Sequence, residues 1–164
     1  MHEPGVARFL RLLEYETWAN ERGLASLASV PAEQRARPAY ARATQLLPHI
    51  ALARTVWLMR IRGVPFEHPE DWFPSWDSAQ AAAELKNLDA QWGDFLGSLR
   101  DQDLARAVRY TSSEGMQYVS TVEEVCTHVF NHSTYHRGQL ARLVHESGGQ
   151  RASTDLIAMT RRTG

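Results

Sequence analysis

Three of the seven histidines, His128, His132 and His136, stand four residues apart in a segment whose apolar residues recur at helical spacing. Residues i and i+4 of a helix share one face and are separated by about 6 Å of rise, so two such imidazoles can bind one divalent ion. All three cannot, because His128 and His136 are about 12 Å apart along the axis and metal–nitrogen bonds are about 2.0–2.1 Å long. The spacing therefore predicts one metal-binding pair, either 128 with 132 or 132 with 136.

A metal site built on such a pair needs a third protein ligand, and His49 is the candidate. It stands in another segment of helical spacing, beside Pro48 and among apolar residues such as Leu47 and Ile50. A histidine in such surroundings is more often a hydrogen-bonded core residue than a ligand. Facing helices of a bundle are nevertheless where metal sites are commonly built, and three imidazoles leave coordination positions open to water.

The residue types argue against several other metal chemistries. Glu124 precedes His128 by four positions, so the Glu-x-x-His pairs of ferritin-like di-iron sites are missing. The segment between His132 and His136 lacks the Glu that serves a zincin protease as general base. Cys126 is the single cysteine, which argues against a zinc finger or a redox pair.

Four long segments must position these histidines, because their apolar residues recur three, four or seven positions apart, as in amphipathic helices. Thr44 is the expected N-cap of the second helix, and Thr121 with Glu124 forms a capping box for the last. Two short β-type runs flank a turn-like Ser-Ser-Glu-Gly, which predicts a hairpin over residues 106–119. The predicted helices cover residues 4–29, 44–63, 77–99 and 121–147.

The order of these elements predicts an all-α fold: an antiparallel four-helix bundle with a short β-hairpin inserted before the last long helix. Residues 64–76 contain three prolines and several aromatic residues, so we expect a loop that packs against the protein. The sequence has no internal repeat and no low-complexity segment. We therefore expect a single domain over residues 1–164.

Composition narrows the possible partners. Lys and Arg number 18 against 19 Asp and Glu, so the chain lacks the basic field typical of nucleic-acid binding. No apolar run approaches the roughly 20 residues of a membrane span. The single cysteine and an N-terminus without a basic and apolar leader favour a cytoplasmic protein. At this length the core needs no metal to fold, so a metal site indicates function.

Residues 128–139, HVFNHSTYHRGQ, closely resemble the NHxxxHRGQ signature of the DinB/YfiT-like family. The resemblance extends to residues 15–20 (YETWAN) and 49–57 (HIALARTVW), and so covers nearly the whole chain. It implies a four-helix bundle, often a homodimer, with one divalent ion such as zinc or nickel per chain. By the family's pattern the ligands are His49, His132 and His136, which leaves His128 to pack beside a ligand or support it.

Other positions in the matching segments are candidates for contact with a substrate or with a metal ligand. These are Asn131, Arg137, Gln139, Tyr15 and Trp18. The two aromatic residues have core packing as the simpler interpretation. Gly138 lies within a predicted helix, where glycine costs about 1 kcal/mol relative to alanine, so we expect it to allow close approach of a neighbouring helix. No residue is assigned as catalytic.

The resemblance implies more than one activity, because similar proteins include S-transferases that use low-molecular-weight thiols and a mycothiol-dependent isomerase. The first hypothesis is a metal-dependent transferase that uses a low-molecular-weight thiol and a small-molecule substrate. The second is a non-catalytic metal-binding protein of a stress response. Metal-dependent hydrolysis is a third, since an open three-histidine site can also lower the pKa of bound water.

Overall fold

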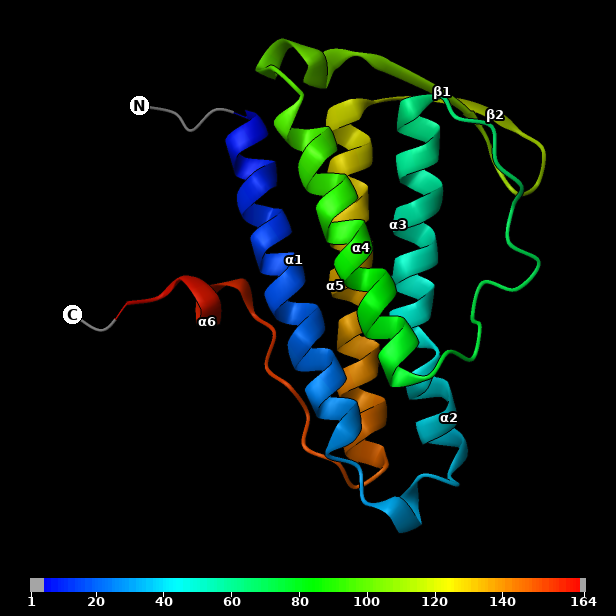
Figure 1. Ribbon diagram of the computed structural model, residues 1–164, viewed down its shortest axis with the longest axis vertical. Coiled ribbons are helices and arrows are strands. Elements are labelled where there is room, and N and C mark those ends of the chain that lie inside the picture. Colours follow the sequence, from blue (N-terminus) through cyan, green and yellow to red (C-terminus); the bar gives the residue numbers. More distant parts are fainter. Residues whose placement is uncertain (1–4, 163–164) are drawn as a thin grey trace.

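The computed structural model describes residues 5–162 and confirms the helical bundle with an inserted hairpin (Figure 1). The four long helices pack around one apolar core. They are α1 (Gly5–Ala28), α3 (Leu46–Arg62), α4 (Ser78–Gly97) and α5 (Val122–Glu146). The shorter helical elements are the 3-10 helices η1 (Ala32–Gln34) and η2 (Asp101–Ala105), the helix α2 (Pro38–Thr44) and the terminal helix α6 (Leu156–Thr160).

The long helices do not simply alternate in direction along the chain. α3 and α4 both run toward the end of the bundle that carries the hairpin, whereas α1 and α5 run away from it (Figure 1). α3 and α4 run in the same direction because residues 63–77 lead back along the side of the bundle to its other end before α4 begins. The contacting pairs α1 with α4 and α3 with α5 are therefore antiparallel, and α3 runs parallel to α4.

The expected helix ends are largely confirmed. The Thr121 hydroxyl accepts a hydrogen bond from the Glu124 amide, and the Glu124 carboxylate accepts one from the Thr121 amide, which is the predicted capping box of α5. Asp77 caps α4 by accepting a hydrogen bond from the Gln80 amide. α3 ends at Gly63, whose φ of 66° is the left-handed conformation that glycine adopts without strain.

The expected N-cap at Thr44 is wrong. Residues Pro38–Thr44 form a separate short helix, α2, which the sequence analysis missed. The Thr44 hydroxyl donates a hydrogen bond back to the carbonyl of Ala41, and Gln45 takes the place of the N-cap before α3. A capping threonine and a last-turn threonine bonded to its own helix have the same sequence signature, because the hydroxyl can serve either backbone group.

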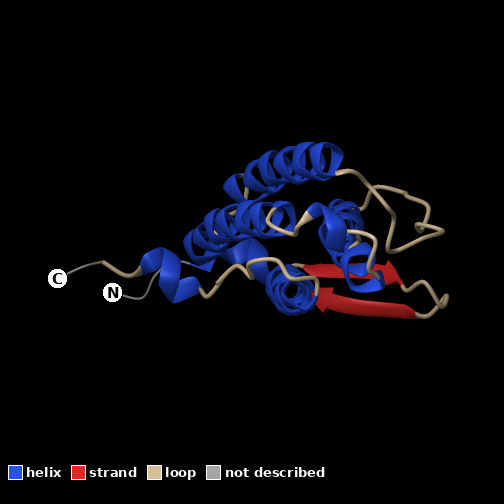
Figure 2. Ribbon diagram, turned by 90° about the horizontal axis from the view of Figure 1, so that it is seen from below, coloured by secondary structure: helices blue, strands red, loops and turns tan. Residues whose placement is uncertain are grey.

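The predicted hairpin is present as β1 (Ala107–Thr111) and β2 (Gln117–Thr121). The strands are antiparallel, with Val108 opposite Ser120 and Tyr110 opposite Tyr118. Figure 2 shows them side by side at one margin of the helices. Val108 of β1 is buried against the bundle, and β2 continues directly into α5. Both strands are therefore held to the helices.

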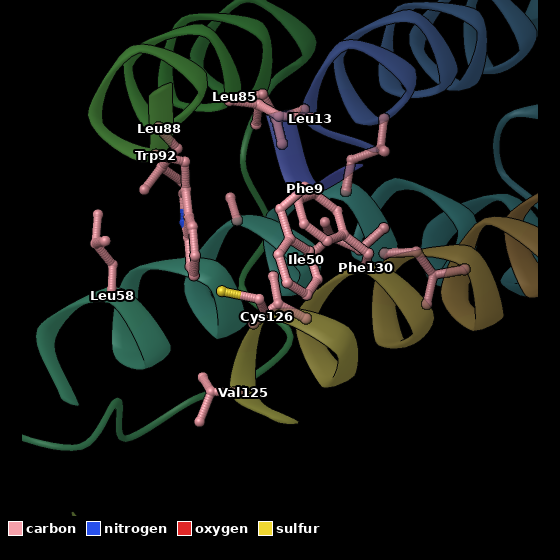
Figure 3. Close-up of a cluster of buried hydrophobic side chains, with 14 of the residues drawn as sticks. Phe9, Leu13, Ile50, Leu58, Leu85, Leu88, Trp92, Val125, Cys126 and Phe130 are labelled. Carbon is pink, nitrogen blue, oxygen red and sulfur yellow. The ribbon is translucent and has the colours of Figure 1, made fainter. Parts of the chain in front are cut away.

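Apolar residues from all four long helices meet in the bundle (Figure 3). Phe9 of α1 stacks on Phe130 of α5, and Trp92 of α4 is fully buried. The hydrophobic core therefore draws on every long helix of the bundle.

Two buried ion pairs cross the bundle. The Arg137 guanidinium of α5 donates hydrogen bonds to Glu16 at 2.8 Å and to Asn20 at 3.0 Å, both on α1. Arg54 of α3 pairs with Asp89 of α4 at 2.7 Å. Removing one partner of such a pair leaves an uncompensated buried charge, so these contacts fix which helix faces meet.

The expectation for Gly138 is wrong, because a Cβ built on this residue would meet no atom within 4 Å. Close approach is instead found at Gly149, where a Cβ would lie 2.6 Å from Val30 Cγ2 and 2.8 Å from Val144 Cγ1. Glycine at position 138 therefore carries the helix cost without a packing role within the chain.

We expect Gly138→Ala to raise the free energy of unfolding by about 0.5–1 kcal/mol, because it removes backbone entropy from the unfolded chain without a clash. Gly149→Ala should lower it by about 1–3 kcal/mol through overpacking against the two valines. Urea denaturation of both variants beside the parent protein measures the difference. Loss of stability in Gly138→Ala would contradict the open surroundings of this residue.

Candidate metal centre

Three of the predicted site residues converge where α3 packs against α5. His49 lies in the first turn of α3, and His132 and His136 lie one turn apart on α5. The Nε2 atom of His49 is 3.3 Å from that of His132 and 3.1 Å from that of His136. Of the described residues, these three are the one group of His, Cys, Asp or Glu whose ligand atoms gather closely enough to hold an ion.

The separations fit a single divalent ion. With metal–nitrogen bonds of about 2.0–2.1 Å, two corners of a tetrahedron are about 3.3–3.4 Å apart and two adjacent corners of an octahedron about 2.9 Å apart. The two separations from His49 Nε2, 3.1 and 3.3 Å, lie between these values, and all three ligand atoms lie within 4.8 Å of one another. The trio of His49, His132 and His136 (hereafter the histidine trio) is thus compatible with either coordination geometry.

The outer nitrogens of two trio members are held by neutral oxygens. Nδ1 of His49 lies 2.8 Å from the backbone carbonyl of Trp72, which can only accept, so Nδ1 carries the proton and Nε2 the lone pair. Nδ1 of His136 lies 3.2 Å from Oε1 of Gln139 and is oriented in the same way. Two neutral imidazoles so arranged point lone pairs at each other across 3.1 Å, which is favourable only with a cation between them.

Burial keeps the trio in the neutral form that binds metal. It lowers the pKa of His49 and His136 below the ordinary value of 6.5, and at His136 repulsion by the charge of His49 adds to the effect of burial. The pKa of His132 falls to about 3, first through burial and then through repulsion by His136, His49 and His128. Neutral ligands need no proton released before an ion binds.

His128 stays outside the trio, although it lies one turn before His132 on α5. Its ring lies 5.6 Å from that of His132 and packs edge-on against Trp57 at 5.1 Å. Burial and the charge of Arg60 lower its pKa. The pair that meets His49 is therefore His132 with His136, and His128 packs beside His132.

The sequence analysis predicted a packed loop over residues 64–76 but not that this loop covers His49. Phe73 stacks on the His49 ring, with centroids 4.1 Å apart and planes inclined by 7°, and Trp72 supplies the carbonyl described above. The aromatic residues between prolines in this segment predicted packing but not its target. The target depends on the path of residues 63–77 along the bundle (Figure 1).

The remaining candidates fall in different places. Gln139 contacts a trio member, whereas Arg137 is buried against Glu16 on the far side of α5. Asn131 is exposed and lines a cavity of about 650 Å³ between α1, α5 and the C-terminal segment. Tyr15 lines the same cavity and donates a hydrogen bond to the Thr154 carbonyl. Trp18 packs against Tyr15 and under Arg22.

The lowered histidine pKa values predict how the metal-free protein responds to acid. Below pH 6.5 the histidines are protonated in the unfolded chain but stay neutral in the folded trio. The free energy of unfolding therefore falls as pH decreases toward the folded pKa values. The slope per histidine is at most about 1.4 kcal/mol per pH unit and is reduced by partial solvent exposure. Urea denaturation at several pH values between 7 and 5, with His132→Gln as the control with a shallower slope, measures it; equal slopes would contradict the assignment.

The helices of the described chain are too short or too polar to cross a membrane. The DinB family model matches residues 1–163. The sequence is 25% identical over 155 residues to "Protein DinB" of Bacillus subtilis (strain 168), with 88% of this chain and 89% of that protein covered. The crystal structure of a DinB-like protein from Bacillus cereus ATCC 10987 shares the fold, with a TM-score of 0.63, 21% identity, and 88% and 94% of the two chains covered. The motif, the bundle and these similarities together place the chain in the DinB family.

Proposed function

We propose that the protein binds one divalent ion per chain through the Nε2 atoms of His49, His132 and His136 and uses it to transfer a low-molecular-weight thiol to a small electrophilic substrate. The observation that carries the proposal is the convergence of three imidazoles, with the Nε2 atoms of His132 and His136 at 3.3 and 3.1 Å from that of His49. Imidazole ligands suit zinc and nickel, and we propose one of these as the ion.

The surroundings of the trio favour an anionic nucleophile. The hydrogen-bond partners of His49 and His136 are a backbone carbonyl and an amide rather than carboxylates, so they add no negative charge. When bound, the ion supplies a double positive charge that stabilises a thiolate. The thiol proton passes to solvent when the thiolate forms; in the transfer, the sulfur–carbon bond then forms as the bond to the leaving group breaks, and the leaving group takes the electron pair of that bond.

The absence of a carboxylate beside the trio, among the described residues, favours thiol transfer over hydrolysis. Hydrolysis of an ordinary ester or amide is aided by a general base beside the ion, and among the described residues no Asp or Glu joins the trio. A thiol is far more acidic than water, so a positive charge alone suffices to ionise it near neutral pH. This difference is why we place thiol transfer ahead of water activation.

The family resemblance supports a homodimer, which we include in the proposal. α6 exposes Ile157 and Leu156, and its apolar side chains are available for contact with a second copy.

Metal analysis of variants tests the ligand set. His132→Ala should lose nearly all bound ion, because two remaining imidazoles hold a divalent ion weakly. His128→Ala should weaken binding by no more than about 10–100-fold, as expected for a residue that packs against a ligand. His145→Ala, which removes an exposed histidine from the same helix, serves as the matched control. Equal occupancy in His132→Ala and the control would refute the assignment.

The activity test uses the metal-loaded protein, an alkyl chloride that becomes fluorescent on alkylating a thiol, and bacillithiol, mycothiol or glutathione in separate reactions. We expect one thiol to be consumed faster than in buffer, with the excess rate abolished by a chelator and by His136→Ala. Should all three thiols react at the buffer rate, a non-catalytic metal-binding role would replace the transferase. Persistence of the excess rate in the chelated protein would move the chemistry away from the trio.

A further inference from the structure

A second concave site lies beside the trio, between the end of α3, the start of the following loop and the hairpin. Its volume is about 610 Å³, and it is separate from the cavity that Asn131 lines. The side chains that shape it come from all three elements. They include Arg60, Phe66, His68, Arg109, Tyr110 and Thr111.

The lining of this pocket is cationic. It contains two arginines, Arg60 and Arg109, and one histidine, and no Asp or Glu among the described residues lines it. Within the described chain, neither guanidinium forms an ion pair with a carboxylate. Two permanent positive charges thus share one concave surface without an anion to offset them, although the protein as a whole carries a net charge of −1.

Arg60 is held in place rather than free in solvent. Its guanidinium lies 4.6 Å from the ring of Trp57, 4.9 Å from that of Tyr110 and 5.8 Å from that of Phe66, and Nη2 donates to the Thr111 carbonyl at 3.0 Å. Nε is buried without a hydrogen-bond partner. A charge that is already ordered and partly dehydrated binds an anion with less entropic cost than a mobile surface arginine.

A second unsatisfied polar atom belongs to another residue that lines the pocket. Nδ1 of His68 is buried and has no hydrogen-bond partner. Its ring packs between those of Phe66 and Trp72, at 5.1 and 6.4 Å. Buried polar atoms without partners are uncommon in folded proteins, and here two belong to residues that line one cationic pocket.

The pocket shares two walls with the histidine trio. On one side Trp57 contacts both Arg60 and His128, and His128 packs against His132. On the other side His68 packs against Trp72, whose carbonyl holds His49. The path of residues 63–77 beside α3 brings these walls together (Figure 1).

We propose that this pocket binds the anionic group, a carboxylate or a phosphate, of a small molecule, with Arg60 and Arg109 as its charged contacts. Its place beside the trio makes that molecule the thiol or the substrate of the reaction, and this second statement rests on the proposed function. The binding itself does not, because none of the trio residues lines the pocket.

The test is an NMR titration of the ¹⁵N-labelled protein with inorganic phosphate and, separately, with propionate, each against sodium chloride at equal ionic strength. We expect one anion to shift the Nε–H signal of Arg60 and the amide signals of residues 111–115 saturably. Arg109→Gln should weaken this binding about threefold to tenfold, whereas Arg142→Gln, an equal charge change on an exposed part of α5, should not alter it. Arg109 is exposed, so its replacement leaves the fold intact.

A parallel titration of His132→Ala separates this proposal from the metal proposal. An anion held in the pocket binds this variant as it binds the parent protein, whatever the metal content. Loss of the shifts in His132→Ala would show that the anion binds at the trio and would overturn the pocket. Shifts that match those in chloride, or that weaken equally in Arg109→Gln and Arg142→Gln, would also overturn it. Which anion saturates identifies the group as carboxylate or phosphate.

Discussion

The structure must hold three imidazole nitrogens within a few ångströms of one another. Two of them direct lone pairs at each other, which is unfavourable unless a cation lies between them. Such an arrangement persists only where the side chains have no freedom to turn away. Here the Trp72 carbonyl fixes one ring from outside, and Gln139 fixes another. The contact of α3 with α5 supplies the backbone frame that both restraints require.

The rotation of α5 about its axis is set by groups on its opposite face. Arg137 follows His136 directly, points toward α1 rather than α3 and forms its buried pair with Glu16. Because a buried arginine without its carboxylate is strongly unfavourable, α5 cannot turn without breaking this pair. The contact of Arg137 with α1 thus helps to orient the face of α5 that carries His132 and His136.

The segment of residues 63–77 links the fold to the chemistry. By returning along the bundle it makes α3 and α4 parallel, and on its way it places Phe73 over His49 and His68 beside Arg60. The hairpin closes the other side of the cationic pocket with Tyr110 and Thr111. The two departures from a plain helical bundle therefore both border the region of the trio, while the interior of the bundle combines apolar side chains with the two buried ion pairs.

Helix spacing, capping residues and the turn between two β-type runs are local signals, and they sufficed for the bundle, the hairpin and the ends of most helices. The histidine spacing also limited the ligands on α5 to two possible pairs. The choice between these pairs came from the family resemblance and agrees with the geometry, in which only 132 and 136 reach His49. Local signals failed at Thr44, where a hydroxyl serves either helix end, and at Gly138, where the neighbouring surface is open. The stacking of Phe73, the burial of Arg137 and the unpaired charges of Arg60 and Arg109 join residues far apart in sequence, so only the packing of the whole chain decided them.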